Sequence, residues 1–151
     1  PPQPSLLHAD WWVPPLFAVA AIVIGVPTVY LDSTFPRLRP PTSSLASPTP
    51  DLTARAVLAF TATYAASGAA FQLFRGDSIP LSLLLAPLAA VIWARFDRSK
   101  TGLVMGALTA LCGPAIEVAL VNWTGWYRYL DPDVWGVPVW IAWVYFAGGP
   151  A

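Results

Sequence analysis

An acidic residue stands inside one of the long apolar stretches of this sequence. Glu117 lies in the middle of the stretch 102–123, three positions after Pro114. Because an ionisable group at membrane depth is costly, we expect it to be protonated, paired or facing a polar cavity, and to be a candidate for function. Its carboxyl group could act as a general acid or bind Mg²⁺ through oxygen. The structural alternative is a protonated Glu117 bonded to a backbone carbonyl that Pro114 frees.

The sequence offers Glu117 no partner for acid–base catalysis. No second acid or histidine lies in an apolar stretch, and the one histidine, His8, lies in the N-terminal segment. The single cysteine, Cys112, cannot form a disulfide or a cysteine zinc site within one copy of the chain. There is no glycine-rich phosphate loop and no Ser/His/Asp or Cys/His pattern, so the usual soluble enzyme classes are excluded.

A short charged turn is the second candidate. Residues 95–100 read Arg-Phe-Asp-Arg-Ser-Lys and are the densest cluster of charge in the sequence. The turn separates two apolar stretches, and it is where a partner in water could most easily bind.

The composition indicates a membrane protein. The 151 residues are 56% hydrophobic and 11% charged, whereas about a quarter of the residues in a soluble domain are charged. The formal net charge is zero, so the chain lacks the basic footprint of a nucleic-acid-binding protein. It begins without Met and ends in an apolar run, and we expect both ends of the full protein to be missing.

Five apolar stretches define the expected fold. A helix needs about 20 such residues to cross a bilayer, and none of the stretches has the polar stripe of a soluble helix. They cover residues 11–31, 54–74, 79–94, 102–123 and 137–151. The sequence therefore predicts an all-α polytopic transmembrane helix bundle in a single membrane domain, residues 1–151. The Pro- and Ser-rich segment 33–50 is expected to be a mobile linker.

Charges in the loops predict the orientation of these spans. The loops after the first and third stretches carry six Lys or Arg residues, and those after the second and fourth carry two. The positive-inside rule then places the turn 95–100 on the cytosolic or equivalent face, and the loop 125–136 on the other.

Small and aromatic residues suggest further contacts. Gly102, Gly106 and Ala110 recur at four-residue spacing, which supports close helix packing, and we favour packing within the chain. Aromatic residues near the ends of the stretches fit a Trp/Tyr belt at headgroup depth. The candidate lipid- or ligand-binding residues are Glu117, Tyr64, Trp123 and Trp126.

Three segments together resemble the insulin-induced gene (Insig) family of membrane proteins. The first is Trp-Trp-Val-Pro-Pro at 11–15, with Tyr-Leu-Asp at 30–32. The second is Leu-Ser-Leu at 81–83, Trp93, and Phe-Asp-Arg-Ser-Lys-Thr-Gly-Leu at 96–103. The third is Gly-Trp-Tyr-Arg-Tyr at 125–129, Pro-Asp at 132–133, Trp140, and Phe-Ala-Gly-Gly at 146–149.

The resemblance implies a non-enzymatic six-helix bundle, of which this chain shows five spans. The family binds a lipid within the bundle, an oxysterol in animals, and holds client membrane proteins through their transmembrane helices. Asp97 matches the family's cytosolic acidic residue for client contact, so Asp97, Arg98 and Trp93 are the expected partner-binding residues. Pro80 stands where the family has a glutamine associated with sterol response, so the resemblance implies a bound lipid without specifying a sterol.

Three functional hypotheses follow. The preferred one is an integral membrane scaffold that binds a membrane lipid and another integral membrane protein, with no catalytic residue, metal or nucleic acid. The resemblance implies the endoplasmic reticulum membrane, with the plastid thylakoid or bacterial inner membrane as alternatives. The second is a small accessory subunit of a pigment-bearing photosynthetic complex that holds chlorophyll or carotenoid, with Glu117 as a Mg ligand. The third is a membrane isoprenoid lyase or cyclase with Glu117 as general acid.

Overall fold

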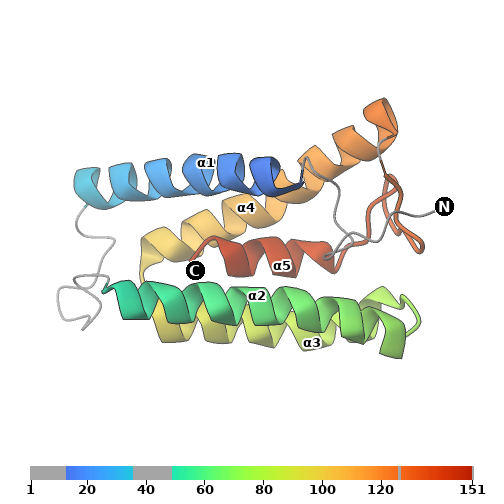
Figure 1. Cartoon of the computed structure of the whole chain (residues 1–151), viewed down its shortest axis with the longest axis horizontal. Coiled ribbons are helices and arrows are strands. Elements are labelled where there is room, and N and C mark those ends of the chain that lie inside the picture. Colours follow the sequence, from blue (N-terminus) through green and yellow to red (C-terminus); the bar gives the residue numbers. More distant parts are fainter. Residues whose placement is uncertain (1–12, 36–48, 126, 151) are drawn as a thin grey trace.

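The computed structural model describes residues 13–35, 49–125 and 127–150, and these form an all-α bundle (Figure 1). The elements in order are α1 (Val13–Thr34), α2 (Pro50–Leu73), α3 (Ser78–Ile92), η2 (Trp93–Asp97), α4 (Lys100–Ala119), η3 (Leu120–Thr124) and α5 (Ile141–Gly148). The only β-pairing within these ranges is an isolated bridge between Val134 and Val137. The predicted fold class is therefore confirmed.

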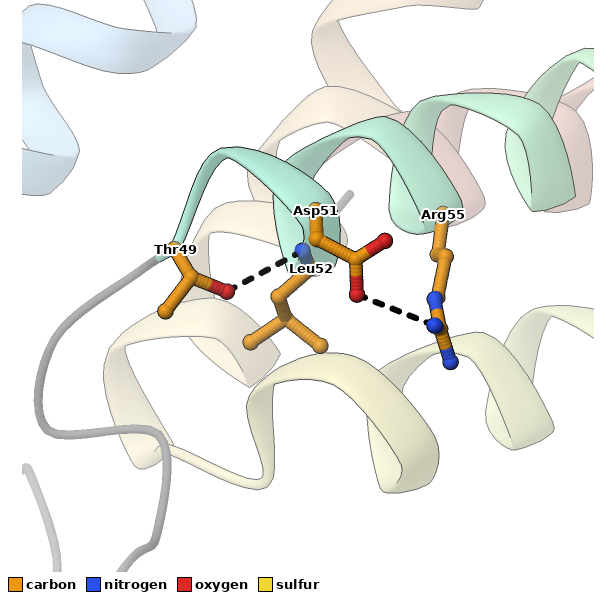
Figure 2. Close-up of polar contacts among 4 residues, drawn as sticks. All are labelled: Thr49, Asp51, Leu52 and Arg55. Atoms are coloured by element: carbon orange, nitrogen blue, oxygen red, sulfur yellow. Dashed lines mark hydrogen bonds and ion pairs between the residues drawn. The ribbon is translucent and has the colours of Figure 1, made fainter.

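The start of α2 is fixed by a cap that hydropathy does not detect. The Thr49 hydroxyl accepts a hydrogen bond from the Leu52 amide at 3.2 Å, and Asp51 forms an ion pair with Arg55 at 3.0 Å (Figure 2). Pro50 follows the cap at the first helical position, where its missing amide hydrogen costs nothing. The helix consequently begins four residues before the apolar stretch, and α1 extends to Thr34, into the other end of the expected linker. Residues 36–48 of that linker lie outside the described residues.

Single π-helical turns lengthen two of the helices. Arg98 N–H donates to the Trp93 carbonyl at 2.8 Å, and Gly125 N–H donates to the Leu120 carbonyl at 3.2 Å. The third stretch, residues 79–94, thus lies in a 20-residue helix that reaches Asp97. Within the described residues, the helices long and apolar enough to cross a bilayer are Pro50–Leu73, Ser78–Asp97 and Lys100–Thr124.

The short helix α5 lies at the centre of the bundle. It packs against α4 and α3 and also contacts α2, whereas α1 contacts α4 (Figure 1). The buried core around it includes Leu81 and Leu85 of α3 together with Ile141 and Val144 of α5. Helix α5 begins at Ile141 instead of near the expected residue 137, because the segment before it is a turn in which Asp133 N–H and Val134 N–H both donate to the Val137 carbonyl.

Glycines let α4 and α5 approach closely. A side chain at Gly149 would put its Cβ 2.7 Å from the Gly106 Cα, and the Tyr145 ring covers Gly113. The predicted packing of the α4 small-residue face within the chain is therefore confirmed. On α2, by contrast, nothing lies within 4 Å of the position that a Cβ at Gly68 would take.

Candidate functional site

The charged turn between η2 and α4 is held by a compact set of hydrogen bonds. Arg98 has the left-handed backbone conformation, with φ of 56°. The Trp93 indole N–H donates to the Ser99 carbonyl at 2.9 Å, and the Ser99 hydroxyl accepts from the Gly102 amide at 2.8 Å as the N-cap of α4. The turn is thus an ordered structure and not a loose loop.

The Asp97 side chain is directed into this turn. Its Oδ1 accepts a hydrogen bond from the Ser99 amide at 3.3 Å, and its carboxylate lies directly against Gly102, in the space that a Cβ there would take. Asp97 is half-buried, whereas Arg98 is exposed. Of the three residues expected to bind a partner, Trp93 and Asp97 build the turn. Arg98 is exposed, and its Nε–H donates to the Ala94 carbonyl.

A cavity of about 400 Å³ adjoins the same turn. Its walls come from α1, the start of α2, the turn itself and the end of α5. Most of the lining is apolar or small, and two carboxylates, Asp32 and Asp97, add acceptor oxygens. Pockets for small ligands span roughly 300–1,000 Å³ and combine an apolar wall with a few placed polar groups, as here. The residues that line it are Ala21, Ile24, Gly25, Thr28, Val29, Asp32, Leu52, Thr53, Ala56, Phe96, Asp97, Ser99, Gly148, Gly149 and Pro150.

Glu117 lies at the other end of α4 and is hydrogen-bonded by two tyrosines. The Tyr145 hydroxyl of α5 donates to its Oε1 at 2.5 Å, and the Tyr129 hydroxyl of the loop after η3 donates to its Oε2 at 3.1 Å. The carboxyl group therefore bonds phenols, and not the carbonyl freed by Pro114 that the structural alternative expected. Burial, followed by the charge of Glu117 and the hydrogen bond to it, raises the pKa of the Tyr129 phenol above its usual value of 10.0. Tyr129 is consequently a neutral donor at physiological pH.

Of the other residues grouped with Glu117, Tyr64 lies near the two tyrosines that bond the carboxyl group. Tyr64 on α2 is 55% exposed, and it is one of the groups whose proximity raises the pKa of the Tyr129 phenol. Trp123 is 86% exposed at the end of η3. Trp126 lies outside the described residues. Within the described ranges, no group of three His, Cys, Asp or Glu side chains could hold a metal ion.

The loop that carries Tyr129 is also fixed to the corner between α2 and α3. The Asp133 Oδ2 accepts hydrogen bonds from the Ser78 hydroxyl and from the Val139 amide, the latter at 2.9 Å. The Asn122 side-chain amide donates to the Trp135 carbonyl at 2.7 Å. Glu117 thus belongs to a network that closes one end of the bundle.

The two candidate regions are far apart. Seventeen residues separate Lys100, at the start of α4, from Glu117, which is about 25 Å at 1.5 Å per residue. Sequence reasoning selected both regions but missed Asp32, Tyr129 and Tyr145. One hint of the tyrosines was present in the sequence: their hydroxyl groups are donors, and the apolar stretches contain a single acid that needs donors. Their spacing to Glu117 follows no local pattern, so the sequence could not pair them with it.

Comparison with known proteins supplies the family context. A family model described as Insulin-induced protein (INSIG) matches residues 3–149. The Insulin-induced gene 1 protein of Bos taurus is 32% identical over 145 residues, which cover 96% of this chain and 49% of that protein. The same-named proteins of Gallus gallus (32% identical, 54% of its length) and Homo sapiens (31%, 49% of its length) also match 96% of this chain. The chain spans about half the length of the curated relatives it matches. No solved structure matches it.

Proposed function

Because the chain belongs to the insulin-induced protein (INSIG) family, we propose that it is an integral membrane scaffold that binds a lipid and a partner membrane protein. The observation that carries this proposal is the shared wall between the cavity and the charged turn. Phe96, Asp97 and Ser99 line the cavity and also form the turn. A ligand in the cavity would therefore contact the same residues that shape the surface offered to a partner.

The lining of the cavity indicates the class of ligand. Small and apolar residues such as Gly25 and Ala56 suit a hydrocarbon body, and the oxygens of Asp32 and Asp97 accept hydrogen bonds. A lipid with a hydroxyl or amine group at its polar end satisfies both requirements.

We place the chain in the endoplasmic reticulum membrane as part of this proposal, as the resemblance implies, and the loop charges support a cytosolic position for the turn. The role we propose is binding without catalysis. Both Glu117 oxygens accept hydrogen bonds from tyrosines, so contacts within the bundle already account for the placement of this carboxyl group. The pigment-subunit and isoprenoid-enzyme hypotheses therefore have less support than the scaffold.

The experiment fills the cavity and asks what the protein still binds. Gly25 on α1 lines the cavity, Gly68 on α2 does not, and at both positions a Cβ would meet nothing within 4 Å. We would purify the wild-type chain, Gly25→Leu and Gly68→Leu from the native membrane in mild detergent. Mass spectrometry would quantify the lipids and membrane proteins that copurify.

The expected result is that Gly25→Leu loses a discrete lipid and retains less partner, while Gly68→Leu behaves like the wild type. Equal lipid retention by the two variants would exclude the cavity as the lipid site. A wild-type chain that retains no stoichiometric membrane protein would refute the scaffold function.

A further inference from the structure

The position of Asp97 bears on how the turn meets a partner. Its carboxylate lies over Gly102, accepts the Ser99 amide hydrogen bond and faces the cavity. An acidic group in direct contact with a partner would be expected to project from the surface. The exposed side chains of the turn are instead the three cations, Arg95, Arg98 and Lys100.

We propose that Asp97 is a positioning residue that shapes the turn, and that Arg95, Arg98 and Lys100 contact an acidic segment of the partner membrane protein. The inference rests on the proposed scaffold function and specifies the chemistry of its partner surface. Asp97 accepts the amide hydrogen bond that follows the left-handed Arg98 and thereby holds the backbone that carries Arg98 and Lys100. The Arg98 side chain also donates through Nε–H to the Ala94 carbonyl.

Charge and geometry favour an acidic protein segment as the occupant of this surface. None of the described carboxylates forms an ion pair with the three cations; the ion pair seen in the described ranges is the one between Arg55 and Asp51. Arginine matches carboxylates with a planar fork of donors. Recognition of anionic lipid typically takes a cluster of about four to eight Lys or Arg residues, more than this turn presents.

Gly102 provides a test of positioning that alters no charge and no exposed side chain. A Cβ at residue 102 would occupy the place of the Asp97 carboxylate, so Gly102→Ala must displace it. If Asp97 acts by position, Gly102→Ala should weaken partner binding as Asp97→Ala does. The double variant should bind no worse than Asp97→Ala alone, because the shortened side chain at position 97 leaves room for the added methyl group.

The experiment measures two quantities for each variant of the full chain in mild detergent. The first is the amount of the stoichiometric membrane partner retained from the native membrane. The second is the hydrogen-exchange rate of the Ser99 amide in the partner-free protein. The variants are Asp97→Asn, Asp97→Ala, Gly102→Ala, the double variant and Arg98→Glu. Arg75→Glu is the matched control, because Arg75 is also exposed and has nearly the same φ, 55° against 56°.

We expect Asp97→Asn to keep most of the partner, since an amide oxygen can still accept the Ser99 hydrogen bond. Asp97→Ala and Gly102→Ala should each retain about tenfold less partner, and their Ser99 amide should exchange faster. Arg98→Glu should lose partner by a similar factor, in the range measured for charged interface pairs. Its Ser99 exchange rate should be unchanged. Arg75→Glu should change neither quantity.

Three results would overturn the inference while the scaffold stands. Asp97→Asn losing as much partner as Asp97→Ala, with Ser99 exchange unchanged, would make the Asp97 charge a direct contact. Arg98→Glu binding like Arg75→Glu would exclude the cations. The surface would be a lipid site if the wild type retains an anionic phospholipid and Arg98→Glu loses that lipid but keeps the protein partner. A wild-type chain without any protein partner would remove the proposed function and this inference with it.

Discussion

The Glu117 carboxylate connects three parts of the bundle through two phenol hydroxyls. It lies on α4, Tyr145 on α5 and Tyr129 in the loop between η3 and α5. Such a group is tolerated at membrane depth because its oxygens have donors, and removing a donor leaves a half-buried acceptor unsatisfied. We therefore expect Glu117 to stabilise the fold.

Glu117→Gln is expected to destabilise the bundle. The amide keeps one acceptor oxygen, but its NH₂ group cannot accept a hydrogen bond from tyrosine, so about 1–3 kcal/mol should be lost. Thermal unfolding in detergent would measure the change. Asp51→Asn is the control, because it breaks an exposed ion pair that is worth well under about 1 kcal/mol. Equal midpoints for the two variants would contradict a structural role for Glu117.

The raised pKa of Tyr129 predicts a loss of stability at alkaline pH. Its folded-state pKa lies above the unfolded value of 10.0, so its contribution to stability is fully present below pH 10 and is lost as the pH rises beyond that value. The thermal midpoint of the wild type should fall more steeply above this pH than that of Tyr129→Phe, and the difference between the two should be constant at lower pH. Parallel curves over the whole range would show that Tyr129 ionises no differently in the folded state.

At the scale of elements, the contact between α4 and α5 depends on missing side chains. Gly149→Ala would place a methyl group 2.7 Å from the Gly106 backbone, and overpacking of this kind typically costs about 1–3 kcal/mol. Gly68→Ala, where nothing lies within 4 Å, should be neutral or slightly stabilising through helix propensity. Thermal unfolding of both variants tests the contact, and a stable Gly149→Ala would show that α5 can shift along α4 without loss.

The helices themselves were predictable from hydropathy, but their ends were not. A run of apolar residues located the stretch that became α2, whereas its start depends on a hydrogen bond from Leu52 to the side chain of Thr49. The π-turns that extend α3 and α4 depend on where single carbonyls find donors, such as the Trp93 carbonyl with Arg98. Average hydropathy contains no information on either.

The candidate sites were likewise predictable only in part: the sequence identified the unusual residues but not their contacts. The charged turn was visible because its residues are consecutive, but the inward direction of Asp97 depends on Gly102 and the Ser99 amide. Glu117 was visible as a charge among apolar residues, but its donors lie 12 and 28 positions away on separate elements. Local sequence identifies which residues are unusual, and only the packing of the bundle identifies their partners.

At the scale of the whole molecule, the charged turn and the loop after η3 should lie on opposite sides of the membrane. The helical stretch Lys100–Thr124 has 25 residues, or about 37 Å at 1.5 Å per residue, which exceeds the roughly 30 Å of a hydrocarbon core. Lys100 is exposed at one end, and Leu130, 85% exposed, lies beyond the other. Single cysteines at these positions therefore report the orientation predicted from the loop charges.

Lys100→Cys and Leu130→Cys would each be made in a Cys112→Ser background, because Cys112 is exposed and its removal leaves a single thiol in each variant. In sealed vesicles of known sidedness, a membrane-impermeant maleimide should label Lys100→Cys only from the cytosolic face and Leu130→Cys only from the opposite face. Reversed labelling would mean that the loop charges do not set the orientation, and the proposed partner surface would then lie on the opposite face of the membrane. Labelling of both cysteines from one face would show that α4 does not cross the membrane, in conflict with its length and hydropathy.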